Sequence, residues 1–289
     1  MHPAPSVIIF TVLSGAGFGY LAFLGLGLAA TGWLAFWQFA LAFAMAVGGL
    51  VSSTFHLGNP QRALLAFTQW RTSWLSREGW AAVASLLLMA AYAIGAIFFA
   101  KVLRPLGLAG ATISIGTVFI TSMIYAQMKT VPRWNSWLTP VYFIACALSA
   151  GSLLSGLRGP ACLFLVALGV VQIICWMSGD GRFANRGHDM NSATGLSGRI
   201  RLFESPHSGT NYLMQEFGFE VARRHAAKLR VICIALISAI PALILLAGNY
   251  PALTGPAFVL HLTGTFVSRW LFFAEAGHVV QLFYGRQTA

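Results

Sequence analysis

Three ionisable residues, His56, Arg62 and Glu78, flank a connection between two apolar runs of the sequence. His56 ends the first run, Gly58 and the Asn-Pro pair after it turn the chain, and Glu78 opens the next run. Both ends therefore meet the same membrane face, where ionisable groups are costly and suggest function. An imidazole that titrates near neutral pH, a fixed cation and a carboxylate are the set that a quinone head group needs. Ordinary charged residues that snorkel to the interface would give the same pattern.

A second group of polar and aromatic residues follows a later apolar run and lies, by the same topology, on the face of His56. Tyr125 is either part of a head-group pocket or a residue of the aromatic belt at the membrane surface. Trp134 and Trp137 are more typical of that belt. The candidate quinone-binding residues are His56, Gly58, Arg62, Glu78, Tyr125 and Trp134.

The last apolar run carries four polar residues, His261, Arg269, Glu275 and His278. Arg269 and Glu275 are six positions apart, so they do not share a helix face. Each must meet another helix or water, and we expect structural polar contacts, with a proton path as the alternative.

Neither a haem nor a metal ion is expected in this chain. A b-type haem needs a pair of axial histidines, usually on facing helices, and His56 lies at a membrane edge. His188 and His207 lie in a loop without ligand spacing. The four cysteines lie inside apolar runs without a Cys-x-x-Cys pair, so we expect small buried side chains and no iron–sulfur cluster.

The elements that must position these residues are membrane helices. Hydrophobic residues make up 57% of the chain and charged residues only 9%, against about 25% charged residues in soluble domains. We expect an all-α polytopic bundle of about eight spans that forms a single integral membrane domain over residues 1–289, with the first span retained. The runs long enough to cross a bilayer are 6–30, 33–56, 79–103, 106–128, 138–157, 159–177, 229–248 and 252–284.

The basic residues gather on alternate connections, which accounts for the net charge of +11 without nucleic-acid binding. Connections 57–78, 129–137 and 178–228 are basic, whereas the opposite ones hold only Lys101, Arg104 and Arg158. The positive-inside rule places the basic connections and both termini in the cytoplasm.

The basic loop 178–228 is the one sizeable segment outside the lipid. Its first half is rich in Gly, Ser and Asn, and it is expected to be irregular. From Asn211 to Lys228 the apolar residues Leu213, Phe217 and Val221 follow helical spacing. This spacing predicts a helix that lies on the membrane surface, that docks a soluble partner, or that does both.

Most of the chain resembles the membrane anchor subunits of dimethyl sulfoxide reductase and its relatives. The resemblance is most specific in His56-Leu57-Gly58-Asn59-Pro60, with Arg62 and Glu78 after it. It continues in Thr130-Val131-Pro132 with Trp134, in Thr139-Pro140, and in Arg269 with its following aromatic residues. The long basic loop, with Glu204-Ser205-Pro206-His207, resembles the anchors of cytoplasmic sulfite dehydrogenases.

This resemblance implies an anchor without haem in the bacterial inner membrane. Such an anchor holds an iron–sulfur subunit and a molybdopterin catalytic subunit and exchanges electrons with ubiquinone or menaquinone in the lipid. It also implies that His56, Arg62 and Glu78 belong to the quinol site. The residues expected to dock the iron–sulfur subunit are Arg71, Arg77, Arg133, Arg223 and Arg224.

Other functions are consistent with parts of the pattern. Electrons can pass from sulfite oxidation to quinone, or from menaquinol to a reductase of the dimethyl sulfoxide type. From other classes, a transporter and a purely structural anchor are the alternatives, although no repeated halves typical of transporters are evident.

Overall fold

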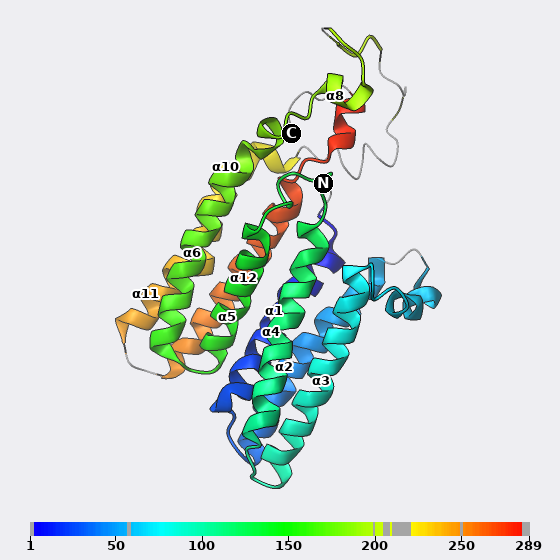
Figure 1. Cartoon of the computed structure of the whole chain (residues 1–289). Coiled ribbons are helices and arrows are strands. Elements are labelled where there is room, and N and C mark those ends of the chain that lie inside the picture. The colour runs from blue at the N-terminus through cyan, green and yellow to red at the C-terminus, as the bar shows by residue number, and fades with distance from the viewer. Residues whose placement is uncertain are drawn as a thin grey trace.

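The described chain is a bundle of long apolar helices that run up and down between two ends (Figure 1). The computed structural model describes residues 3–56, 59–198, 200–204, 209, 221–248 and 251–284, without the side chains of residues 56, 60, 221–224 and 251. Over this part the secondary structure is helical, with no strand. Seven helical stretches are long and apolar enough to span a membrane, and an eighth, Leu138–Leu154, is shorter. This confirms the expected all-α bundle of about eight spans.

The helices form two groups. The first comprises α1 (Pro5–Phe23) with the π-helical turn η1 (Leu24–Leu28), α2 (Trp33–Ser52), α3 (Trp74–Phe98) and α4 (Arg104–Ala126). The second comprises α5 (Leu138–Leu154), α6 (Arg158–Asp180), α10 (Val221–Ile234), the π-helical turn η4 (Ala235–Ala239), α11 (Ile240–Ala247) and α12 (Thr254–Ala274). Helix α1 packs against α2, α4, α5 and α12 and so joins the groups.

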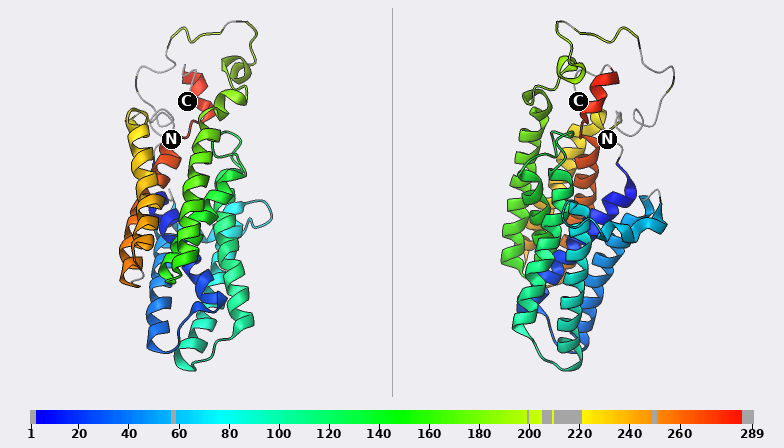
Figure 2. Two further views of the ribbon diagram at one scale, coloured as in Figure 1. Left: turned by 90° about the vertical axis from the view of Figure 1, so that its left-hand side faces the viewer. Right: turned by 45° about the vertical axis from the view of Figure 1, so that its right-hand side comes forward.

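Short segments connect the helices at one end of the bundle, and both marked termini lie at that end (Figures 1 and 2). We call it the basic face, defined by the described residues of the connections 53–73, 127–137 and 181–209 and of the segment 275–284. It contains the described segments η2 (Ser53–His56), η3 (Pro60–Phe67), α7 (Arg182–Asn185), α8 (Met190–Thr194) and η6 (Val279–Tyr284). At the opposite end lies η5 (Pro251–Leu253).

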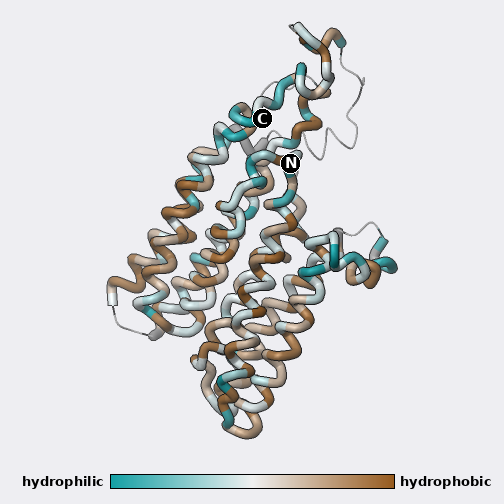
Figure 3. Tube along the Cα trace, in the orientation of Figure 1, coloured by the Kyte–Doolittle hydropathy of each residue, from teal (hydrophilic) through white to brown (hydrophobic). Residues whose placement is uncertain are grey.

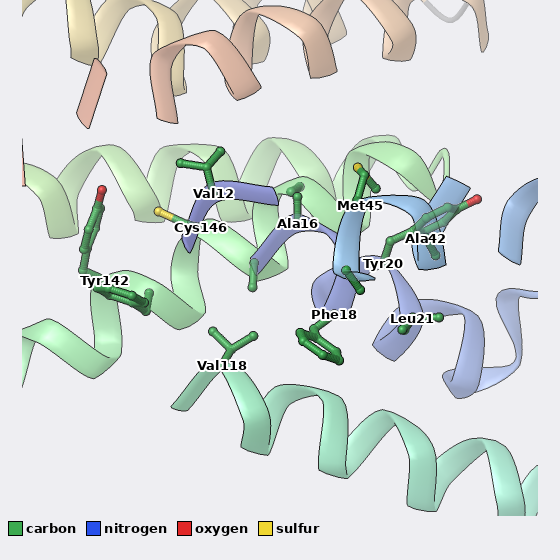
Figure 4. Packing of buried hydrophobic residues seen from close by; sticks show 14 of the residues in the cluster. Val12, Ala16, Phe18, Tyr20, Leu21, Ala42, Met45, Val118, Tyr142 and Cys146 are labelled. Carbon is green, nitrogen blue, oxygen red and sulfur yellow. The ribbon is translucent and has the colours of Figure 1, made fainter. Parts of the chain in front are cut away.

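Small residues allow the central helices to approach closely. A Cβ atom on Gly19 of α1 would collide with the backbone carbonyl of Ala147 in α5, and one on Gly151 would meet Gly19 in return. In lipid the helices associate through such packing, because apolar surface alone gives no drive. Around this contact, Val12 and Phe18 of α1 lie close to α2, Val118 of α4 and Cys146 of α5 (Figure 4).

The residues along the spans are mostly hydrophobic, and hydrophilic residues gather at the connections (Figure 3). Large apolar side chains such as Leu87, Leu163 and Leu243 are exposed on the outside of the bundle. In water such a surface would promote aggregation, whereas lipid solvates it.

Three helix boundaries differ from the sequence-based expectation. The third span begins at Trp74, because Ser73 accepts a hydrogen bond from the Ser76 amide and caps the helix, so Glu78 lies one turn inside it. The last helix ends at Ala274, before η6. Of the expected surface helix 211–228, residues 211–220 lie outside the described part. Residues 221–228 are the start of α10, which continues into the seventh span, so a separate surface helix ending at Lys228 is wrong.

Candidate functional site

Glu78 is a buried carboxyl group between α3 and α4. Its side chain lies one turn inside α3, near the basic face, and the residue is only 4% exposed. The hydroxyl of Thr121 on α4 donates a hydrogen bond to Glu78 Oε1. No ion pair to Glu78 is found among the described residues. A buried carboxyl whose partner is a neutral hydroxyl can exist with or without its proton, which is the property that proton transfer requires.

Tyr125 lies one turn beyond Thr121 on α4 and is buried among aromatic rings. Its ring centroid lies 5.4 to 5.7 Å from the centroids of four rings, those of Trp134, Phe143, Phe272 and Phe273. Glu78 and Arg269 both lie within electrostatic range of Tyr125. Helices α3, α4 and α12 therefore bring a carboxyl, a phenol and a guanidinium into one region inside the bundle.

Trp134 closes this region from the basic face. The residue is 2% exposed, its indole lies parallel to Phe272 at 5.2 Å, and Nε1 donates to the Phe272 carbonyl at 2.9 Å. The interpretation of Trp134 as a belt residue is wrong, because the turn from Val131 points the indole into the core and not towards lipid. Trp137, at 72% exposure, has the position that a belt residue needs.

The His56 motif lies at the end of α2, on the same end of the bundle as Glu78. The chain leaves α2 through η2, and Ser52 Oγ donates to the Ser6 carbonyl at 2.9 Å, which fixes this exit against α1. The His56 side chain and Gly58 lie outside the described residues. Arg62 is exposed in η3, and no contact between Arg62 and Glu78 occurs in the part of the chain that the structure describes.

Arg77 fastens the segment after η3 to the start of α3. Its Nε donates to the Trp70 carbonyl at 3.0 Å, one terminal nitrogen donates to the Arg71 carbonyl at 2.7 Å, and the guanidinium lies 4.5 Å from the Trp74 ring centre. The docking role predicted for Arg77 would have to use its remaining donors. Arg71 is exposed and stacks only on Trp70, at 5.5 Å, so it stays a candidate for docking.

A four-residue ion-pair network, absent from the sequence-based expectation, lies under the basic face. Arg133 contacts Asp180 at 2.9 Å and Glu275 at 2.7 Å, and Arg230 contacts the same two acids at 2.6 and 2.7 Å. These pairs connect the loop before α5 with the ends of α6, α10 and α12. Glu275 thus finds partners on other elements, as expected.

Arg133 is paired with Asp180 and Glu275 inside the protein. Its position therefore gives no support to the docking role predicted for it. The side chains of Arg223 and Arg224 lie outside the described residues. The signal that could have revealed the network is the scarcity of acids, since 7 acidic residues face 18 basic ones and each acid near the basic face has several possible partners.

Arg269 is a buried cation on the inner side of the aromatic cluster. Its guanidinium carbon lies 3.7 Å from the ring centre of Phe143 and 4.7 Å from that of Tyr142. Two of its nitrogens, Nε and one terminal nitrogen, have no hydrogen-bond partner among the described residues. The expected polar contacts of Arg269 are therefore mainly ring contacts.

His278 lies outside the spans and joins the chain after α12 to the basic face. The Val280 amide donates to His278 Nδ1 at 3.1 Å, and the Val279 amide donates to the Thr130 carbonyl at 3.0 Å. Burial lowers the pKa of His278, in agreement with an Nδ1 that accepts a hydrogen bond. Within the described residues, no three His, Cys, Asp or Glu side chains come together as a metal-binding group.

Comparison with known proteins gives one family and two relatives. The sequence model of the DMSO reductase anchor subunit (DmsC) matches residues 1–285. The C subunit of the sulfite dehydrogenase of Allochromatium vinosum is 28% identical over 324 aligned positions, which cover 98% of this chain and 99% of the relative. The C chain of the anaerobic dimethyl sulfoxide reductase of Escherichia coli K12 is 29% identical over 150 positions, which cover 44% of this chain and 47% of the relative.

Proposed function

The chain belongs to the DMSO reductase anchor subunit family, and from this we propose that it is the quinone-reactive membrane anchor of a three-subunit oxidoreductase. In this proposal an iron–sulfur subunit and a molybdopterin catalytic subunit dock at the basic face. Electrons pass between them and ubiquinone or menaquinone in the bilayer. The membrane is the bacterial inner membrane, with both termini in the cytoplasm, on the charge asymmetry of the connections.

The observation that carries the proposal is the buried carboxyl of Glu78 beside the Tyr125 cluster. It lies at the same end of the bundle as His56, where electrons from a docked cluster would arrive. Quinone reduction consumes two electrons and two protons, so its site needs groups that hold and move protons near the electron donor. A carboxyl group bonded to a hydroxyl, with no paired cation among the described residues, meets this need.

Each residue of the proposed site has a separate task. The His56 imidazole donates a hydrogen bond to a ring oxygen of the substrate and supplies or receives a proton. Arg62, which stays charged, stabilises negative charge that develops on the head group. Glu78 exchanges protons with water at the basic face. The rings of Tyr125 and Trp134, packed edge to face, form the aromatic side of the site.

Sulfite oxidation is the proposed source of the electrons. The support is coverage: the sulfite dehydrogenase relative aligns with nearly the whole chain, including the basic loop, whereas the dimethyl sulfoxide reductase relative aligns with less than half. Electron flow from menaquinol to a reductase is the second candidate, and it would use the same site in the reverse direction.

Replacement of His56 tests the quinone site directly. In the assembled complex, His56→Ala should lower quinone-coupled turnover about ten- to hundredfold, the effect of losing a hydrogen bond to a charged state. Turnover with a soluble artificial electron carrier should not change, because the catalytic subunit is intact. His225→Ala, at an exposed position on α10, is the matched control and should behave like the native complex.

The outcomes separate the alternatives. Native quinone turnover by the assembled His56→Ala complex would reject the assignment of His56. Native quinone-coupled turnover by the two soluble subunits without this chain would show a purely structural anchor. Solute uptake by liposomes that contain this chain alone would indicate a transporter.

A further inference from the structure

Two small cavities lie inside the bundle, one within the second helix group and one between the two groups. The outer cavity, of about 40 Å³, lies directly beneath the ion-pair network. Its lining includes Arg133 and Glu275 of the network and, deeper in the bundle, Gln172 and Tyr142. At about 10–15 Å³ for each water molecule, this volume holds roughly three. The polar lining and the 48% exposed side chain of Asp180 above it connect the outer cavity to the basic face.

The inner cavity lies deeper and is smaller, at about 10 Å³, which is room for about one water molecule. It is lined by Arg269, His261 and Cys146 among apolar residues of α1, α4 and α5. The two unpartnered nitrogens of Arg269 belong to this region. A buried cation with free donors is costly, and water in the inner cavity would satisfy them.

A chain of hydrogen-bonding side chains lies between the two cavities. Ser268 Oγ donates to Gln172 Oε1 at 2.6 Å and lies 2.5 Å from the hydroxyl of Tyr142. Cys146 lies one turn further along α5, and its side chain lies near that of Tyr142 (Figure 4). Gln172 and Tyr142 line the outer cavity, and Cys146 lines the inner one. Tyr142 and Cys146, one turn apart on α5, are therefore the polar side chains through which the two cavities come closest.

His261 is the deepest ionisable group on this line. Its Nδ1 lies 2.8 Å from the Ile237 carbonyl in the π-helical turn η4. Glu275 and His261 are fourteen residues apart on the polar face of α12. At ~1.5 Å per residue the line is about 21 Å long, against a hydrocarbon core of ~30 Å.

We propose that this line is a hydrated pathway that exchanges protons between the basic face and His261, about two-thirds of the way across the membrane. Protons enter at the outer cavity and pass across the hydroxyl group of Tyr142, which Ser268 and Gln172 hold in position. The hydroxyl accepts a proton on one side and releases one on the other, so no net charge is left behind. Arg269 does not titrate; its task is to hold water in the inner cavity. The pathway is separate from Glu78, which lies between α3 and α4.

The thiols of the chain are natural reporters for this pathway, because Cys146 lines the inner cavity and Cys175 lines the outer one. The experiment places the full chain in lipid bilayers, transfers it to D₂O and follows the S–H stretching band in the infrared. Variants that lack one cysteine at a time assign the band. A Ser85→Cys variant supplies the slow reference, because Ser85 is fully buried between α3 and α4, hydrogen-bonded to Ser114 and remote from both cavities.

The proposal expects the Cys146 thiol to exchange at least about tenfold faster than the thiol of the Ser85→Cys variant. Ser268→Ala should slow Cys146 by about tenfold, the effect of one lost hydrogen bond, and leave Cys175 unchanged. Gln172→Leu should act in the same direction.

Two results would overturn the pathway. The first is exchange at Cys146 in the native chain that is as slow as in the Ser85→Cys reference, a comparison that stands even if Ser268→Ala does not fold. The second is fast exchange at Cys146 that neither Ser268→Ala nor Gln172→Leu alters, because water would then arrive by another route. The measurement needs no electron flow, so it can fail or succeed independently of the quinone site.

Discussion

Glu78 and Glu275 are two nearly buried acids at the same end of one bundle, and their surroundings are opposite. Glu78, 4% exposed, receives one hydrogen bond from a neutral hydroxyl. Glu275, with a side chain 6% exposed, contacts two arginines at 2.7 Å. Both side chains are largely buried, and the two acids differ in the partners that their carboxyl groups contact. Two arginines hold Glu275 in a structural ion-pair network, whereas the partner of Glu78 is a neutral hydroxyl, beside which a carboxyl can take up or release a proton.

Removal of the Glu78 proton site should have the largest effect on function. Glu78→Gln keeps the oxygen that accepts from Thr121 and removes only the ability to titrate. Quinone-coupled turnover of the assembled complex should fall about a hundredfold, the lower end for a lost acid–base group. Thermal stability should change little, because the hydrogen bond survives.

Quinone turnover at the native rate by Glu78→Gln complexes would contradict the proton-transfer role of Glu78. The matched control is Glu275→Gln, the same change at the same end of the bundle. A complex of this variant, once assembled, should keep native turnover with quinone.

Removal of the Glu275 charge should instead have the larger effect on stability. Glu275→Gln leaves Arg133 and Arg230 with Asp180 alone, and breaking a buried pair costs ~3–5 kcal/mol. Because both arginines are partly solvated, we expect the free energy of unfolding to fall by about 2–3 kcal/mol, which is at or below the lower end of that range. Denaturation of the purified chain in detergent, followed by tryptophan fluorescence, measures this loss.

Asp180→Asn is the comparison variant for this prediction, because it removes the other acid of the same network and should cost less stability. Its side chain is 48% exposed, and exposed pairs contribute only ~0.2–1 kcal/mol. An Asp180→Asn variant that lost as much stability as Glu275→Gln would show that burial does not set the strength of the network.

The smallest expected effect is a pH dependence at His278, close to Glu275 in the chain. Burial lowers its pKa in the folded protein, so the folded state binds the proton more weakly than the unfolded state. Its contribution to stability is present above the ordinary histidine pKa of ~6.5 and is lost as the pH falls below that value. Melting temperatures at neutral pH and at about pH 5 should differ less for His278→Asn than for the native chain. An equal difference in both proteins would assign the pH dependence to other groups.

The sequence predicted the helices well and the contacts poorly, for a physical reason. Hydropathy is a local property, so each span appeared as a run, but the ends were displaced by five residues for the third span, 79–103 against Trp74–Phe98, and by ten residues at the end of the last span. The ion pair of Arg133 with Glu275 joins residues 142 positions apart, which no local pattern can reveal. Trp134 shows the same limit, because a tryptophan at a membrane edge has the same neighbours in sequence whether its ring faces lipid or the core.

The sequence supplied the residues of the candidate site, and the structure brings only some of them together. Glu78, Tyr125 and Trp134 are brought into one region by α3, α4 and the loop before α5. Arg62 stands apart from them in η3. The burial of Arg269 against the rings of Tyr142 and Phe143 could not be derived from spacing on α12, because both rings belong to another helix.

The π-helical turn η4 has a consequence for how this family can gain and lose residues. A π turn contains one residue more than the α-helix it interrupts, and it leaves a backbone carbonyl turned outward, here that of Ile237 towards His261. Deletion of a single residue between Ala235 and Ala239 would restore an ordinary helix and rotate everything on one side of it by about 100°. The histidine would lose its acceptor in the same step. In an alignment of relatives, a one-residue gap in this turn should therefore coincide with the loss of histidine at the position of His261.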